Sequence, residues 1–136
     1  MKHGVKTKKL GRTQAHRKAL LRNLARSLFV YERIRTTLPK AKQAQRLAER
    51  LISYSKLGTL AARRNAQSIL TDKPITKKLF DDIGPRFKDR LGGSTRILRL
   101  GQRPSDGAEM SYLELVVRKE RTPSDQKEKG KEKKEK

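Results

Sequence analysis

The feature that most constrains this chain is positive charge gathered at its N-terminal end. The 136 residues include 36 lysines and arginines but only 14 acidic residues, which gives a formal net charge of +22. Nine of those basic residues lie within residues 1–31, and the first carboxylate is Glu32. Such a charge opposes compaction unless anions neutralise it. Because only 33% of residues are apolar, we expect a small core and tails ordered largely by an anionic partner.

Composition divides the chain into three parts. Residues 1–12, MKHGVKTKKLGR, have two glycines and no regular apolar period, which predicts an extended basic arm. Residues 13–118 carry periodic apolar patterns and are expected to form a single α+β domain. Residues 119–136 mix lysine and glutamate without any apolar residue, so we predict a disordered tail.

Periodicity and capping residues place the helices. A helical stripe of leucine and alanine begins near Ala15, with Thr13 as its expected N-cap. A second helix is expected to start at Pro39 and to end at Gly58. Thr59 would cap a third helix over residues 60–70. A fourth, short amphipathic segment is predicted from Pro74 to Gly84-Pro85.

Three short segments read as strands. RIRTT, residues 33–37, is β-branched, and residues 95–100 and 110–117 have apolar residues in alternation. The last two are expected to pair as an antiparallel hairpin around Asp106-Gly107. The fold class predicted is α+β, with four helices packed on a small three-stranded mixed sheet in the order α-β-α-α-α-β-β.

Two basic zones favour nucleic acid as the partner. The first is the arm together with a helical stripe of Lys18, Arg22 and Arg26 at four-residue spacing, and the second runs from Arg86 to Arg103 among glycines. Lysines and arginines that contact phosphates release counterions, and arginine also binds phosphate oxygens through two nitrogens. Aromatic residues are sparse and expected in the core, so we predict recognition of phosphates and shape rather than base stacking.

Enzyme chemistry is poorly supported. The chain has no cysteine, no phosphate-binding glycine loop, and two histidines without a matching nucleophile. Asp81 and Asp82 are neighbours on a predicted helix, so their carboxylates diverge and read as surface charge. We therefore expect no catalytic residue, metal, cofactor or small-molecule substrate. We also expect no membrane span, because no apolar run approaches 18 residues, and the protein is predicted to be soluble and intracellular.

Charge alone does not separate RNA from DNA. A DNA-binding architectural protein of the nucleoid type is the alternative, although no helix-turn-helix, zinc finger or heptad repeat is evident. A long arm without its own core needs a partner that encloses it. Folded RNA with clefts provides such an enclosure more readily than a duplex surface does.

Five blocks in order resemble one known family. They are HRKALLRNLARSL (16–28), RTTLPKAK (35–42), LFDDIGPRF (79–87), GGSTRIL (92–98) and YLELV (112–116). This order is similar to that of the L17 family of bacterial large-subunit ribosomal proteins, and the resemblance covers residues 1–118. Two features depart from the family pattern: Ser94 stands where the family usually has tyrosine, and residues 119–136 extend past the usual end.

The resemblance implies a structural, non-catalytic role in the large ribosomal subunit of the cytoplasm. It implies binding to large-subunit ribosomal RNA near the site where the nascent chain leaves, beside neighbouring ribosomal proteins. Matching positions give a first set of expected RNA contacts: Lys2, His3, Arg12, His16, Arg17, Arg22, Asn23, Lys40, Lys42, Arg86, Arg90, Arg96 and Arg103. Charge in the two basic zones adds Lys6, Lys8, Lys9, Lys18, Arg26 and Arg99.

Overall fold

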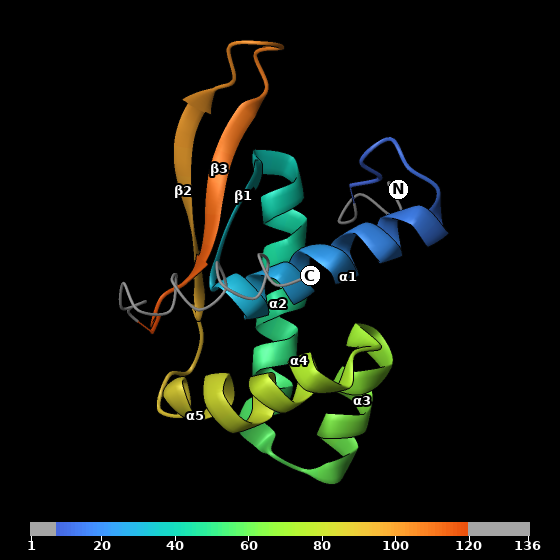
Figure 1. The fold of residues 1–136 in the computed structure, drawn as a ribbon, viewed down its shortest axis with the longest axis vertical. Coiled ribbons are helices and arrows are strands. Elements are labelled where there is room, and N and C mark those ends of the chain that lie inside the picture. Colours follow the sequence, from blue (N-terminus) through green and yellow to red (C-terminus); the bar gives the residue numbers. More distant parts are fainter. Residues whose placement is uncertain (1–7, 120–136) are drawn as a thin grey trace, which may run out of the picture.

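The computed structural model describes residues 8–119, and its elements alternate between helices and a small sheet (Figure 1). In chain order they are α1 (Gln14–Tyr31), β1 (Arg33–Thr37), α2 (Leu38–Leu57), α3 (Leu60–Leu70), α4 (Lys73–Lys78), the π-helical turn η1 (Leu79–Ile83), α5 (Gly84–Arg86), β2 (Thr95–Gln102) and β3 (Glu109–Leu115). The predicted α+β class and order of elements are confirmed.

The sheet is antiparallel throughout, so the predicted mixed sheet is wrong. Its strand order is β1-β3-β2, and β3 runs opposite to both neighbours. Leu113 at the centre of β3 pairs with Ile34 of β1 on one side and Ile97 of β2 on the other. The strands β1 and β2 do not pair with each other, because β3 returns from its hairpin with β2 and occupies the position between them.

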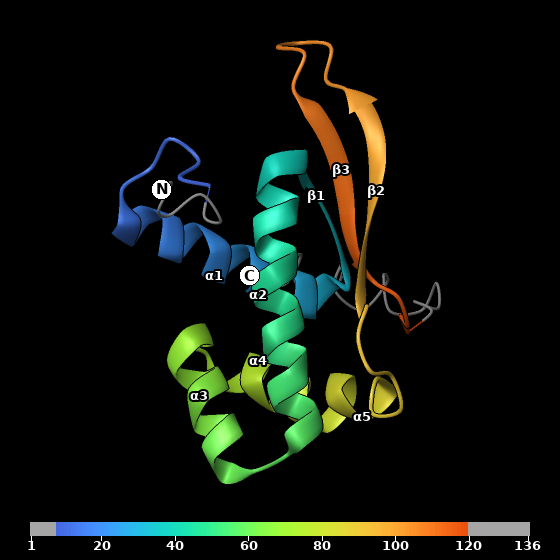
Figure 2. The same cartoon turned by 180° about the vertical axis from the view of Figure 1, so that it is seen from behind.

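Helix α2 forms the centre of the molecule. It lies between the sheet on one side and α1 and α3 on the other, as the two opposite views show (Figures 1 and 2). Its buried face packs Leu51 and Ile52 into one core with Leu113 and Leu115 of β3. The expected small core is therefore a single cluster shared by α1, α2, the shorter helices and the sheet.

Local capping chemistry fixes the helix ends as expected. Thr13 accepts a hydrogen bond from the His16 backbone N–H at 3.4 Å, and Thr59 accepts one from Ala62 at 3.1 Å. Gly58 ends α2 in the left-handed conformation, at φ 66°. Threonine side chains satisfy the first helical donors, and glycine adopts positive φ without a Cβ penalty.

The fourth helical segment continues past the predicted stop at Gly84-Pro85. In η1 the Gly84 N–H donates to the Leu79 carbonyl, five residues earlier, and the chain stays helical to Arg86. The wider π turn precedes Pro85, whose ring would clash with a regular helical backbone. Gly84 is needed because a Cβ there would lie 2.9 Å from Ser55 of α2.

Within the predicted arm, the described part is not extended. The Arg12 N–H donates to the Lys9 carbonyl at 3.1 Å, and the two residues between them have positive φ, 54° at Leu10 and 62° at Gly11. These residues form a tight turn that leads into α1. The rest of the predicted arm, residues 1–7, and the predicted disordered tail from residue 120 lie outside the described residues.

Candidate nucleic-acid interface

The first predicted RNA-contacting residues that the structure describes lie in the turn before α1. Lys8 and Lys9 are exposed. Arg12 instead folds back, and one of its terminal nitrogens donates to the Leu10 carbonyl at 2.7 Å. Arg17 reaches toward the Arg12 carbonyl at 3.5 Å. The two lysines thus face solvent, while the arginines also brace the turn; the predicted contacts Lys2, His3 and Lys6 lie outside the described residues.

The basic stripe on α1 has two different roles. Arg22 Nε donates to the Ile69 carbonyl at 2.8 Å, and Arg26 Nε donates to the Leu70 carbonyl at 2.7 Å. These carbonyls end α3, where the helix leaves them without backbone partners and has no basic residue of its own in the last turn. Two arginines from α1 therefore cap α3, while Lys18 remains on the surface.

Exposed polar residues accompany this stripe along α1. His16 and Asn23 both lie on the solvent side of the helix, as does Lys18. No carboxylate occurs in α1, which spans Gln14–Tyr31. The exposed side of this helix is therefore uniformly cationic or neutral.

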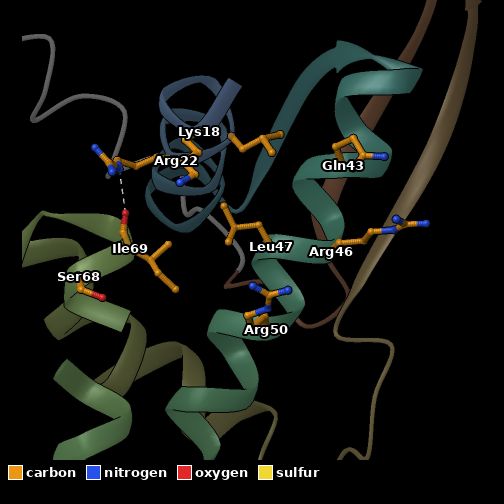
Figure 3. Close-up of a pocket in the computed structure, with 9 residues that line it drawn as sticks. Lys18, Arg22, Gln43, Arg46, Leu47, Arg50, Ser68 and Ile69 are labelled. Atoms are coloured by element: carbon orange, nitrogen blue, oxygen red, sulfur yellow. Dashed lines mark hydrogen bonds between the residues drawn. The ribbon is translucent and has the colours of Figure 1, made fainter. Parts of the chain in front are cut away.

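Beside the α3 cap, a groove of about 520 Å³ lies between α1, α2 and the end of α3 (Figure 3). Among residues 8–119, those that line the groove include four cations and no carboxylate, and its apolar lining comes from leucine and isoleucine. The lining residues are Lys18, Leu21, Arg22, Gln43, Arg46, Leu47, Arg50, Ser68 and Ile69. Since α1 provides two of the cations and α2 the other two, positive charge flanks the groove from both helices.

Sequence reasoning missed Arg46 and Arg50 in this groove. The signal was present, because Lys42, Arg46 and Arg50 follow at four-residue intervals and so share one edge of α2. All three are exposed. The predicted contacts Lys40 and Lys42 lie near the N-terminal end of this helix, where Lys42 extends the same basic edge and Lys40 is half-buried.

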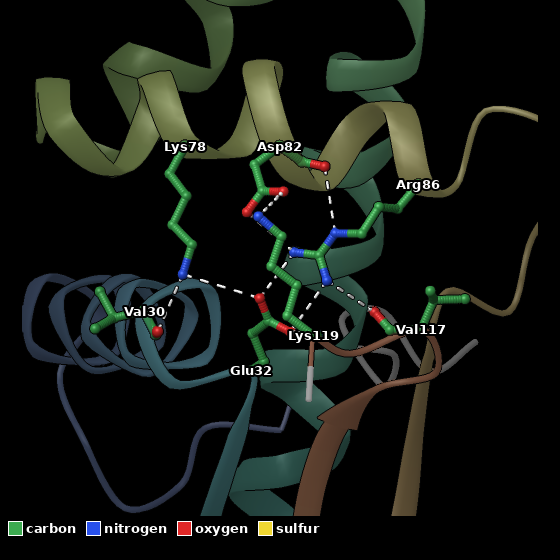
Figure 4. A network of polar contacts seen from close by, with 7 residues as sticks. All are labelled: Val30, Glu32, Lys78, Asp82, Arg86, Val117 and Lys119. Carbon is green, nitrogen blue, oxygen red and sulfur yellow. Dashed lines mark hydrogen bonds and ion pairs between the residues drawn. The ribbon is translucent and has the colours of Figure 1, made fainter. Parts of the chain in front are cut away.

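Arg86, a predicted contact in the second basic zone, is instead the centre of an ion-pair network (Figure 4). Its guanidinium lies 2.8 and 3.1 Å from the two oxygens of Glu32, 3.4 Å from Asp82 and 3.2 Å from the Val117 carbonyl. Lys78 approaches Glu32 at 4.0 Å and donates to the Val30 carbonyl at 3.1 Å. The network joins the end of α1 to the π turn and to the chain after β3.

The protonation state of Glu32 reflects these contacts. Burial by itself would raise the pKa of the Glu32 carboxyl, but the Arg86 hydrogen bond, the Lys119 backbone N–H at 2.8 Å and the charges of Arg86 and Lys78 outweigh it. The net result is a pKa below the ordinary value. The hydrogen bond to Glu32 in turn raises the pKa of Arg86. Glu32 is therefore ionised at neutral pH and holds Arg86 in place.

The other predicted contacts of the second basic zone are of two kinds: some pair with carboxylates of the fold, and others are exposed to solvent. Arg96 pairs with Glu114 at 2.5 Å, and Arg103 pairs with Asp106 at 2.6 Å within the β2–β3 turn. The Arg103 hydrogen bond lowers the pKa of Asp106 to about 2. Arg90 and Arg99 are exposed. Much of the positive charge in this zone is thus balanced by carboxylates that sequence reasoning did not assign to it.

The sheet has a further basic cluster on the face away from α2. Glu114 is only 1% exposed, yet Arg33 at 3.3 Å, Arg96 at 2.5 Å and Arg118 at 3.5 Å surround its carboxylate. Arg33 also stacks on the Tyr112 ring at 3.8 Å. Cationic partners offset the cost of burying a carboxylate, so this cluster is a structural element of the sheet.

The aspartate pair has no catalytic geometry. Asp81 pairs with Arg63 at 3.2 Å, while Asp82 pairs with Arg86 and with Lys119 at 2.9 Å, so the two carboxylates serve separate ion pairs. Within residues 8–119, no three histidines, cysteines or acidic residues come together to form a metal site. None of the helices in the same range has the length and apolar content needed to cross a membrane.

Comparison with known proteins gives the family. A family model described as ribosomal protein L17 matches residues 20–116. The chain is 54% identical over 116 residues to the large ribosomal subunit protein bL17 of Treponema denticola, covering 85% of this chain and 65% of that protein. It is 49% identical over 120 residues to bL17 of Hyphomonas neptunium, covering 88% and 86%. The chain belongs to the ribosomal protein L17 family.

The L17 family consists of structural, non-enzymatic proteins of the large ribosomal subunit. This agrees with the expectation, drawn from the residues, that the chain is not an enzyme. The L17 match includes Arg22, Arg46 and Arg50 of the groove. It also includes Glu32, Lys78, Asp82 and Arg86 of the ion-pair network, whereas Val117 and Lys119 lie beyond its end and Lys18 and the basic arm lie before its start. The chain spans 65% of the Treponema relative's length, slightly less than two thirds.

Ser94, which the resemblance predicts to differ from the usual residue of the L17 family, is buried. Ser94 is 3% exposed, and its carbonyl accepts the Val116 N–H at 3.0 Å beside the start of β2. In this protein Ser94 thus adds a backbone hydrogen bond between the segments that flank β2 and β3 at this end of the sheet.

Proposed function

We propose that this chain is a structural constituent of the large ribosomal subunit that binds and stabilises folded large-subunit ribosomal RNA. The proposal is supported by the family and by one observation on charge. Carboxylates neutralise Arg86, Arg96 and Arg103, whereas α1 has none along its whole length. The exposed side of α1 and the turn before it are therefore the surface best suited to a polyanion.

The physical role of this surface is to supply counterions for RNA. Lys8, Lys9 and Lys18 are exposed, so their ammonium groups can approach phosphates from the solvent. Each phosphate contact releases condensed counterions, which makes binding favourable and strongly dependent on salt. Tyr31 is the only aromatic side chain in α1 that is exposed, so recognition relies on shape and phosphate position more than on base stacking.

The proposal includes a location. In it the protein works in the cytoplasm as part of the ribosome, near the region where the nascent chain leaves, and it contacts neighbouring large-subunit proteins. The basis is the family resemblance of the sequence blocks. The RNA-binding set in this proposal consists of the predicted contacts on the arm, on α1 and at the start of α2, together with the exposed Arg90 and Arg99. The predicted contacts Arg86, Arg96 and Arg103 are secondary in it, because carboxylates neutralise their charges.

Gradient sedimentation of a lysate tests the proposal directly. The tagged chain should migrate with the large ribosomal subunit, and ribonuclease treatment should release it. If the chain instead migrates with chromosomal DNA and is released by deoxyribonuclease, the architectural DNA-binding alternative holds. Migration as a free protein under low-salt conditions would contradict the structural role.

A further inference from the structure

A second hollow, of about 760 Å³, lies between α3 and α4. It is lined by residues of α3 from Leu60 to Ser68 and by residues of α4 from Lys73 to Lys77, and most of its lining is apolar. Figures 1 and 2 show α3 and α4 at the end of α2 that lies away from the β2–β3 hairpin. None of the contacts assigned to RNA in the proposed function comes from these two helices.

The two hydroxyl groups that line this hollow are already used within their own helices. Thr76, only 4% exposed, donates its hydroxyl proton to the Asp72 carbonyl at 2.7 Å. Ser68 donates its own to the Asn65 carbonyl at 2.8 Å. Aliphatic surface comes from Leu60, from proline and from the alkyl stems of the long side chains. Such a surface favours an apolar occupant, because filling it removes apolar area from water.

Exposed leucines stand at the junction of α2 and α3. Leu60, which lines the hollow, is 63% exposed, and Leu57, three residues earlier, is 68% exposed. Single exposed leucines are ordinary in soluble proteins. A leucine that adjoins an apolar hollow instead enlarges it into a patch, and patches of this kind mark interaction surfaces.

The hollow is also bordered by positive charge that the fold does not balance. Arg64, Lys73 and Lys77 are exposed, and none of them forms an ion pair with a carboxylate of residues 8–119. Asp72, next to Lys73 in the chain, serves as the N-cap of α4 and accepts the Ile75 N–H at 3.1 Å. Complementary charge therefore requires an occupant that carries carboxylates or phosphates.

The apolar lining favours a protein over a nucleic acid as that occupant. Among the described residues, none that lines the hollow is aromatic, so a base has no ring on which to stack. Phe80 is only 7% exposed, and the Arg63 guanidinium covers its ring at 4.9 Å from the centroid. A sugar-phosphate backbone would use the cations but leave the apolar hollow unfilled. A protein segment can satisfy both, with an apolar side chain inside and carboxylates at the rim.

We propose that the hollow between α3 and α4 is a docking site for an acidic amphipathic segment of another protein. An apolar side chain of that segment enters the hollow, and flanking aspartates or glutamates pair with Arg64, Lys73 and Lys77. The inference rests on the proposed function and deepens it, because it assigns a surface and a chemistry to the contact with a neighbouring protein. The turn before α1 and the exposed side of α1 remain available to RNA.

Site-specific photo-crosslinking of the full chain in cells tests this inference. The photoreactive residue p-benzoylphenylalanine replaces Leu60 at the hollow or, as the matched control, Leu91, an exposed leucine in the loop between α5 and β2. Large ribosomal subunits are isolated on a gradient after irradiation, and the cross-linked partners are identified by mass spectrometry. The Leu60 position should cross-link to a protein segment in which an apolar residue is flanked by carboxylates. The Leu91 position should not reach that segment.

Two charge variants of the Leu60 cross-linking chain test the role of the rim. Arg64→Gln with Lys77→Gln removes an arginine and a lysine from the hollow, and Arg35→Gln with Lys88→Gln removes an exposed arginine and an exposed lysine elsewhere. The first pair should lower the yield of the cross-link by about fivefold or more, because two of the three attractive charges are lost. The second pair should leave the yield near that of the unchanged chain.

The possible results separate the inference from the proposed function. A cross-link to an acidic amphipathic segment that weakens only in the Arg64 and Lys77 variant supports the inference. A cross-link to RNA, a cross-link to a protein segment without carboxylates, or no cross-link in assembled subunits would overturn it while the proposed function stands. Equal yields in the two charge variants would also overturn it, because the cations would then have no part in docking. Absence of the chain from the large subunit would contradict the proposed function and the inference with it.

Discussion

Replacing Arg86 should destabilise the domain while leaving its RNA-binding surface intact. Arg86 and Glu32 have side chains only 15% and 10% exposed, and two of their atom pairs lie at 2.8 and 3.1 Å. Breaking a buried ion pair by removing one partner costs about 3–5 kcal/mol, while an exposed pair contributes about 0–1. For this nearly buried pair we expect Arg86→Met to lower the free energy of unfolding by about 3 kcal/mol.

Urea denaturation and thermal melting measure this loss. With about 4 °C per kcal/mol for a domain of this size, the melting temperature should fall by roughly 12 °C. The matched control is Arg90→Met, which removes an exposed arginine four residues later and should change stability by less than about 0.5 kcal/mol. A double-mutant cycle with Glu32→Gln should show strong coupling between the two positions.

The same pair predicts a pH dependence. The pKa of Glu32 is lower in the folded state than its ordinary value of 4.5, so the folded state gains stability from this group above that pH. The stability gap between wild type and Glu32→Gln should therefore shrink as the pH falls from about 6 to about 3.5. A gap that is constant over this range, or an Arg86→Met variant as stable as the control, would refute the role given to the network.

Other substitutions test separate parts of the account. Leu113→Ala should cost about 2–5 kcal/mol in urea denaturation, because Leu113 is fully buried at the centre of the sheet; RNA affinity of the folded fraction should be unchanged. Gly84→Ala should cost about 1–3 kcal/mol, and Ser55→Gly should recover part of it, because the new Cβ would lie 2.9 Å from Ser55. Glu114→Gln should destabilise the domain by about 1 kcal/mol and make its stability rise with added salt, because three partly exposed arginines would then repel one another without the carboxylate between them; no response to salt would contradict that.

The parts of the fold that could be predicted from the sequence are those set by interactions between residues close together in the chain. Thr13, Gly58 and Thr59 act on backbone groups within a few residues, so a reader of the sequence can place those helix ends. The pairing of β1 with β3 brings together Ile34 and Leu113, which lie far apart in the sequence. No short-range pattern specifies that β3 takes the central position in the sheet. The π turn before Pro85 likewise depends on packing against Ser55 of a distant helix.

The candidate nucleic-acid interface could also be predicted only in part from the sequence. Basic residues can be recognised in the sequence, but their ion-pair partners cannot. Arg86 pairs with Glu32, which is 54 residues away in the sequence, and Arg96 pairs with Glu114, which lies opposite it on the neighbouring strand. Charge counts therefore overstate how many cations of the second zone are available to RNA. Arg46 and Arg50 were visible as a helical edge, but their relation to Lys18 emerges only when α1 packs beside α2.

The salt dependence of binding to large-subunit ribosomal RNA tests the central claim most directly, that the N-terminal turn and α1 neutralise RNA phosphates. The comparison is between wild type and a variant with alanine at the exposed residues Lys8, Lys9 and Lys18. If all three contact phosphates, the slope of log K against log salt should flatten by about 2.7, at about 0.9 per contact, with a melting temperature within about 2 °C of wild type. A wild-type chain indifferent to this RNA in dilute buffer, or a variant with an unchanged slope, would contradict the claim.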